Sequence, residues 1–145
     1  MHHHLILRVV AKLLLPFILL YALYVQWHGD YGPGGGFQAG VIFAVGFILY
    51  ALVYGVDALV RVVPHRALIG AMSIGLLLYA GTGVVSLILG LDYLDYSRLA
   101  HDPVHGQEWG ILLVELGVGI TVASAMTSIF VAFATREPDI DDEDW

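Results

Sequence analysis

The chain is 145 residues long, and 59% of its residues are hydrophobic while only 13% are charged. Soluble domains are about 45–50% apolar and about 25% charged, so this composition excludes a soluble globule and indicates an integral membrane protein. The sequence contains no cysteine, which excludes disulfides, thiolate metal sites and thiol catalysis. The net charge of −7 comes mostly from acidic residues after position 136, so nucleic acid is not an expected partner.

Four segments contain the roughly 20 mostly apolar residues that a membrane helix needs. They are residues 5–26, 37–60, 67–91 and 109–135. A signal peptide is the alternative for the first segment, but no small-residue cleavage site precedes the polar loop that follows it. The sequence therefore predicts an all-α, polytopic membrane protein. Its four transmembrane helices form one bundle, a single membrane domain over residues 1–136.

Basic residues in the short flanks predict the orientation of these spans. One group consists of the N-terminal flank, the 61–66 turn and the C-terminal flank, and it contains Arg8, Lys12, Arg61, Arg66 and Arg136. The loops at 27–36 and 92–108 contain only Arg98. We therefore expect both termini in the cytoplasm and those two loops outside. Residues 137–145 are predicted to be an acidic, mobile cytoplasmic tail.

The most distinctive local feature is the sequence Gly-Pro-Gly-Gly-Gly-Phe-Gln-Ala-Gly at 32–40, where the first outer loop becomes the second span. Its glycines permit positive φ, and Pro33 excludes regular helix before it. One interpretation is a tight turn that lets a partner helix pack closely. The other is an unwound entrance whose free N–H groups shape an ion path. By contrast, Gly55 lies inside the second span, and we expect a substitution there to affect mainly packing.

Glu115 is the second distinctive feature, because it lies about 9 Å below Trp109 in the fourth span. A carboxylate at that depth is costly and usually faces protein or water. A proton relay and a structural hydrogen bond to a neighbouring helix both remain open. Asp102 and Pro103 have the chemistry of a helix N-cap and first helical residue, so a short interfacial helix or the fourth span itself begins there.

Small residues recur at a spacing of four along the fourth span, and such stripes let membrane helices approach closely. The helix-packing candidates are Gly117, Gly119, Thr121 and Ala123. A metal site is not predicted, because the polar residues of the loop at 101–108 lack a strong ligand spacing such as HExxH. No arrangement typical of nucleophilic or hydrolytic catalysis is present, so we do not expect an enzyme.

These motifs resemble the MnhB/MrpB family, which are small membrane subunits of the multisubunit, Mrp-type sodium/proton antiporter. The resemblance includes His28, the run from Pro33 to Gly40, the His105-Gly106-Gln107 segment and the run from Glu115 to Val122. It covers nearly the whole chain. Ala39 departs from the pattern, since the family often has a second glycine there.

The resemblance implies a small subunit in a bacterial or archaeal inner membrane, within a complex that exchanges sodium ions for protons. It implies other antiporter subunits as partners, including the large antiporter-like subunit, and no cofactor. It strengthens an ion-path interpretation beside the structural one, and the candidates for either role are the residues of the two motifs: Glu115, His28, Pro33, Gly34, Gly35, Gly36, Phe37 and Gly40. The alternative is the homologous small membrane subunit of a hydrogenase-type or other redox-linked complex.

Overall fold

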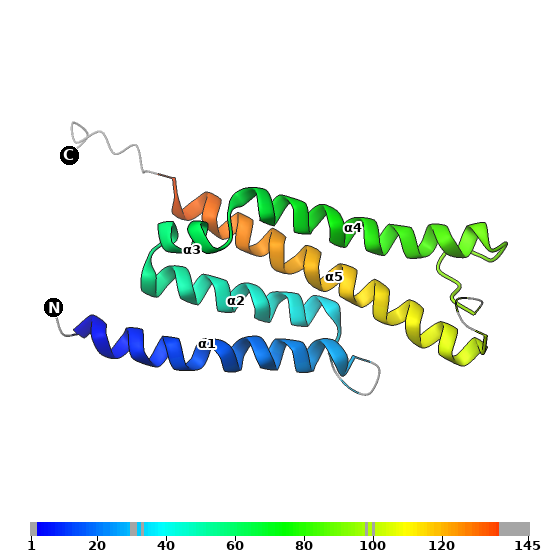
Figure 1. Cartoon of the computed structure of the whole chain (residues 1–145), viewed down its shortest axis with the longest axis horizontal. Coiled ribbons are helices and arrows are strands. Elements are labelled where there is room, and N and C mark those ends of the chain that lie inside the picture. The colour runs from blue at the N-terminus through cyan, green and yellow to red at the C-terminus, as the bar shows by residue number, and fades with distance from the viewer. Residues whose placement is uncertain (1–2, 30–31, 33, 98, 100, 137–145) are drawn as a thin grey trace, which may run out of the picture.

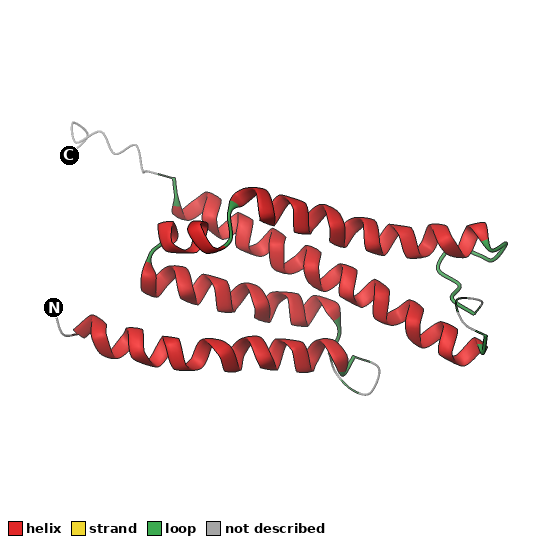
Figure 2. Cartoon of the chain, viewed as in Figure 1, coloured by secondary structure: helices red, strands yellow, loops and turns green. Residues whose placement is uncertain are grey.

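A computed structural model describes residues 3–29, 32, 34–97, 99 and 101–136. Pro33, Arg98 and the acidic segment 137–145 lie outside these described residues. Within the described ranges every element of regular secondary structure is a helix (Figure 2). These are α1 (His3–Trp27), α2 (Gly36–Tyr54), α3 (Val56–Val62), α4 (His65–Ile88) and α5 (Pro103–Ala134). The four long helices are apolar enough to cross a membrane. The predicted all-α fold with four transmembrane helices is therefore confirmed.

The second predicted span is interrupted, which corrects its expected course over residues 37–60. Gly55 ends α2 and begins α3 with φ 97° and ψ 151°, a conformation that essentially only glycine adopts. The expectation that Gly55 matters mainly for packing was therefore wrong. An added Cβ at Gly55 would meet no atom within 4 Å. This glycine is needed for its backbone shape, which separates the α2 span from the short α3.

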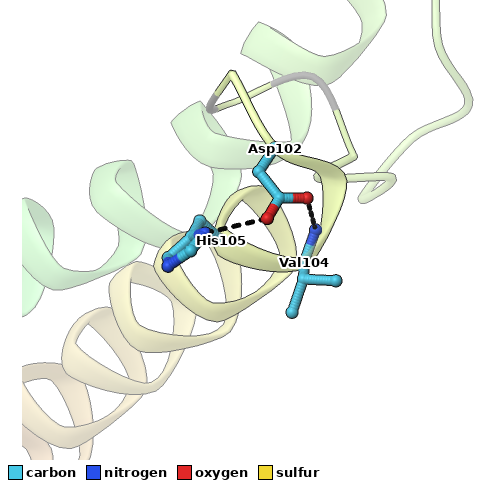
Figure 3. Close-up of polar contacts among 3 residues, drawn as sticks. All are labelled: Asp102, Val104 and His105. Atoms are coloured by element: carbon cyan, nitrogen blue, oxygen red, sulfur yellow. Dashed lines mark hydrogen bonds and ion pairs between the residues drawn. The ribbon is translucent and has the colours of Figure 1, made fainter.

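The fourth span begins earlier than residue 109, because Asp102 and Pro103 start α5 itself. The Asp102 Oδ1 atom accepts a hydrogen bond from the Val104 N–H at 3.2 Å, and Pro103 occupies the first turn (Figure 3). His105 Nδ1 lies 3.1 Å from the other Asp102 oxygen. At 32 residues α5 is about 48 Å long, which exceeds the roughly 30 Å hydrocarbon core of a bilayer. A helix of this length is accommodated by tilting or by extending beyond the hydrocarbon core.

The long helices lie side by side in the order α1, α2, α5, α4 (Figure 1). The chain thus inserts α5 between α2 and α4, and the bundle is open, with α1 and α4 at its two edges. Figure 1 also shows that the start of α1 and the end of α5 lie at the same end of the layer. The turn from α1 to α2 lies at the opposite end, which is where the glycine motif begins α2.

The distribution of side chains is the reverse of that in a soluble protein. Small residues such as Ala22, Ala39 and Ala44 are buried between helices, whereas large apolar side chains such as Ile88 and Phe133 are more than 70% exposed. Lipid solvates such side chains, while small residues allow the helix backbones to approach. Among the described residues, a cluster of buried apolar side chains lies near the α3 end, around Ala51, Leu59 and Val131. The packing therefore agrees with a membrane location.

Candidate functional site

The turn between α1 and α2 folds back onto the last turn of α1. The Val25 carbonyl accepts hydrogen bonds from the N–H groups of both His28 and Gly35, at 3.4 and 3.3 Å. Gly34 lies against the same carbonyl, and an added Cβ there would be 3.0 Å from the Val25 oxygen. One backbone oxygen thus anchors the loop at both of its ends.

Gly35 is the N-cap of α2 and has a conformation reserved for glycine. Its φ is 114° and its ψ is 178°, and no side chain caps the helix. Its carbonyl accepts the first bond of the helix, from the Ala39 N–H at 3.0 Å. The sequence predicted positive φ in this motif, and Gly35 is the residue that adopts it.

The Glu115 carboxylate occupies the space that side chains at Gly29 and Gly35 would fill. A Cβ added to Gly29 would lie 2.6 Å from Oε2 and 2.7 Å from Oε1, and one added to Gly35 would lie 2.9 Å from Oε1. A Cβ on Gly36 would overlap the backbone carbonyl of Glu115 itself. The glycine loop and the membrane carboxylate, predicted as two separate features, are therefore parts of one site. We call Gly29, Gly35, Gly36 and Glu115 the glycine–carboxylate site.

The close contact between α2 and α5 continues one helical turn further along both helices, at Gly40 and Gly119. A Cβ on Gly40 would lie 2.6 Å from the Gly119 carbonyl oxygen. A Cβ on Gly119 would lie 3.2 Å from the Gly36 carbonyl oxygen and 2.5 Å from the Gln26 Oε1 atom of α1. Three helices therefore converge on Gly119, where a Cβ would collide with Gln26 unless that side chain moved.

The other packing candidates of α5 lie against α4 or beside a pocket. Gly117 and Gly75 face each other closely, since a Cβ on Gly75 would lie 2.6 Å from the Gly117 oxygen. The Thr121 hydroxyl donates to the Gly117 carbonyl at 2.8 Å, which keeps that hydroxyl paired inside the membrane. Ala123 lines a pocket between α1, α2 and α5. The α5 stripes thus lie against helices of this same chain.

The comparisons with known proteins identify the family of the chain. A family model described as "Domain related to MnhB subunit of Na+/H+ antiporter" matches residues 6–128. The chain belongs to this MnhB-related family. A protein of Staphylococcus haemolyticus named "Putative antiporter subunit mnhB2" is 32% identical over 134 residues, covering 89% of this chain and 93% of its own length. A protein of the same name from Staphylococcus aureus strain Newman is 31% identical over 132 residues, with the same coverage.

Two other predicted residues of this MnhB-related chain lie on its outer surface. The His28 ring is exposed and stacks on Tyr24, with 4.4 Å between the ring centroids. Phe37 follows Gly36 at the start of α2 but is 64% exposed, and it lines a shallow surface pocket with Tyr21 and Gln38. Phe37 therefore faces lipid or a neighbouring chain, whereas the glycines beside it face Glu115.

Two titratable residues at the start of α5 hold the first turn of that helix in place. Asp102 and His105 form the N-cap contact of α5. Among the residues that the structure describes, no group of three or more His, Asp or Glu side chains is placed to hold a metal ion. Residues 103–108, predicted as part of a loop, are therefore the first turns of α5.

Gln26 and Tyr96 are buried residues that sequence reasoning missed as parts of the packing. Gln26 is 6% exposed and its amide oxygen lies against Gly119. Tyr96 is 8% exposed and packs on Gly106 and Gly110, where the loop between α4 and α5 covers the start of α5. Burial, reinforced by the neighbouring Tyr79 and Tyr93 rings, raises the pKa of the Tyr96 phenol above its ordinary value, so it stays protonated at neutral pH. A polar residue at the end of an apolar span was the available signal for Gln26.

Proposed function

We propose that this chain is a small integral membrane subunit of a multisubunit Na+/H+ antiporter, and that its glycine–carboxylate site is part of the ion path of the complex. Membership of the MnhB-related family supports the first statement. The second statement rests on one observation: the Glu115 carboxylate lies against Gly29 and Gly35 at the turn between α1 and α2. This proposal takes Na+ and H+ as the transported ions and other antiporter subunits, including the large antiporter-like subunit, as partners.

The chemistry of the site suits proton exchange. A carboxylate inside an apolar span is retained where it faces protein or water, and such groups commonly mark ion or proton pathways. The glycines beside Glu115 carry no side chain, so the carboxylate approaches the loop backbone directly. The loop between α1 and α2 lies at the end of the layer that is predicted, from the distribution of basic residues, to face the outside.

Assembly is the second part of the proposed role. The small-residue stripes of α5 are already used against α2 and α4, so partner subunits would contact the exposed outer faces. The α1 edge offers large apolar side chains such as Leu13, Phe17 and Leu20, each more than 60% exposed. Such a face is suited to lipid and to transmembrane helices of other subunits. Co-purification with antiporter subunits supports this role, whereas co-purification with redox-cluster proteins would favour the hydrogenase-type alternative.

Replacing Glu115 by Gln tests the ion-path role, because it keeps the size of the side chain and removes its charge and titration. We expect Glu115→Gln to lower sodium/proton exchange in membrane vesicles or shift its pH profile, at equal subunit content on blots. Glu115→Asp, which still titrates, should retain more activity. Glu108→Gln is the matched control, because Glu108 is exposed on the first turns of the same helix. An unchanged pH profile in Glu115→Gln would leave Glu115 as a packing residue.

Orientation is a further part of the proposal, with both termini in the cytoplasm of a bacterial or archaeal cell and the glycine loop outside. The chain has no native cysteine, so single cysteines report sidedness directly. Gly32, in the turn between α1 and α2, and Arg136, just after α5, are both exposed. That turn and the end of α5 lie at opposite ends of the layer (Figure 1). An impermeant thiol reagent added to intact cells should label Gly32→Cys and leave Arg136→Cys unmodified. The reverse labelling would invert the topology.

A further inference from the structure

A pocket of about 280 Å³ lies between α1, α2 and α5, next to the glycine–carboxylate site along α5. Its wall begins at Leu116, the residue after Glu115, and extends along one face of α5 to Ser124. At 1.5 Å per residue, Ser124 is about 14 Å further along the helix than Glu115. Most of the wall is apolar, with Phe43 and Ile120 among its side chains. We call this space the inner pocket.

Two buried polar side chains line the inner pocket. Gln26 and Ser124 are each 6% exposed, and each contributes to its wall. In the described part of the chain, no hydrogen bond reaches either side chain from another protein group. Thr82, Ser86 and Thr127 behave differently, since each donates to a carbonyl four residues earlier. Among the described residues, the buried Ser128 Oγ atom on α5 also has no hydrogen-bond partner. An unpaired amide and hydroxyl inside a membrane are costly, so both require a polar occupant of the pocket.

Water is a better partner for the Gln26 amide and the Ser124 hydroxyl than a side chain of this protein. A water molecule needs about 30 Å³ of liquid volume and two or more polar partners, so the pocket has room for several. Gln26 contacts Gly119, one helical turn below Glu115, and Ser124 lies farther along the same pocket. Waters spaced about 2.8 Å apart could therefore link these groups where direct hydrogen bonds cannot.

We infer that the inner pocket binds water between Gln26 and Ser124, and that this water extends the proton path from Glu115 toward the middle of the membrane. The inference rests on the proposed ion-path role of Glu115. Gln26 is a positioning residue in it: its amide holds the first water below the carboxylate. Ser124 holds the far end. Only protons move along this path, since each water accepts one proton and passes another on.

Gln26→Met and Gln26→Glu separate water binding from packing. Methionine keeps the length of the side chain and removes every hydrogen bond, whereas glutamate keeps the hydrogen-bonding capacity. If Gln26 binds water, Gln26→Met lowers sodium/proton exchange by about tenfold, the factor that one hydrogen bond is worth, while Gln26→Glu keeps most of the activity. If Gln26 only packs against Gly119 or a partner helix, methionine is tolerated and glutamate is not, which overturns the inference. Gln38→Met is the matched control, because Gln38 is exposed at the start of α2.

Thiol labelling of the assembled complex tests for the water itself. Only a thiolate reacts, and a thiolate forms where water is present. A small water-soluble reagent such as 2-aminoethyl methanethiosulfonate should therefore modify Ser124→Cys but not Leu52→Cys, whose position on α2 is 69% exposed to the surroundings of the layer. An unreactive Ser124→Cys would mean that lipid or a partner helix fills the pocket, and the inference would fall.

The two proposals fail in different ways. A loss of exchange in Glu115→Gln together with normal exchange in Gln26→Met would refute the inner water path and leave the ion-path role of Glu115 standing. Normal exchange and an unchanged pH profile in Glu115→Gln would refute the ion-path role, and with it the inference that depends on it.

Discussion

Gly35 and Gly55 flank α2 and are alike in backbone but different in surroundings. Both cap the helix without a side-chain hydrogen bond, and both have positive φ, 114° and 97°. A Cβ at Gly35 would lie 2.9 Å from the Glu115 carboxylate, whereas a Cβ at Gly55 would meet nothing within 4 Å. The backbone conformation thus marks where a helix is interrupted. The neighbouring side chain decides whether that interruption is also a candidate functional site.

The largest expected effect comes from Gly36, which lies on the Gly35 side of this comparison. A Cβ at Gly36 would overlap the Glu115 backbone carbonyl, and two helix backbones cannot yield as a flexible side chain can. We expect Gly36→Val to force α2 away from α5 and remove the chain from the complex, as measured by blotting the purified complex. Gly32→Val is the control, since no atom lies within 4 Å of its Cβ position. Normal assembly of Gly36→Val would show that α2 and α5 do not approach this closely.

Gly119 gives the next largest effect, because three helices meet there. Gly119→Leu would push into the Gln26 amide and the Gly36 carbonyl, so assembly should fall sharply through steric exclusion. Gly81→Leu introduces the same side chain into another span, at a position with open space around its Cβ, and should assemble normally. Equal yields of the two complexes would mean that the Gly119 face is open to lipid.

The smallest expected effects come from replacing Gly35 or Gly55 by alanine, and this pair separates the two ends of α2 most directly. Each is expected to cost about 1–3 kcal/mol of stability, because alanine is strained in either backbone conformation. Only Gly35→Ala also displaces the Glu115 carboxylate. We therefore expect Gly55→Ala to lower the amount of assembled subunit while exchange per assembled complex is unchanged. Gly35→Ala should lower both quantities.

This last pair is measured as sodium/proton exchange in vesicles, divided by subunit content. The same specific activity in both variants would remove the distinction between the two ends of α2 and would reduce the glycine motif to a tight turn. A loss of specific activity in Gly55→Ala alone would move the functional site to the α3 end of the layer.

Local features of the sequence predicted much of this protein. The spans follow from hydropathy, and the family follows from motifs that include the glycine segment and the run beginning at Glu115. The Asp102–Pro103 pair indicated a helix start but left open whether a short interfacial helix or the fourth span begins there, and the structure shows that α5 does. These properties depend on a residue and its near neighbours, so they can be seen without knowing the fold. The same reasoning marked Glu115 as unusual, because an acid inside an apolar span is costly wherever the helix lies.

Only the tertiary structure decided which of these features meet. The apolar character of α2, α4 and α5 extends around the whole helix, so no polar face indicates how each is rotated or which neighbour it packs against. The order α1, α2, α5, α4 brings Glu115 to Gly29 and Gly35, about 80 residues earlier in the chain, and buries Gln26 on Gly119. The interruption at Gly55 was likewise hidden, because glycine is common inside membrane helices and only the backbone shows its positive φ. Hydropathy determines that a helix lies in the membrane, whereas contacts of side chains and backbones between helices determine where its few polar groups face.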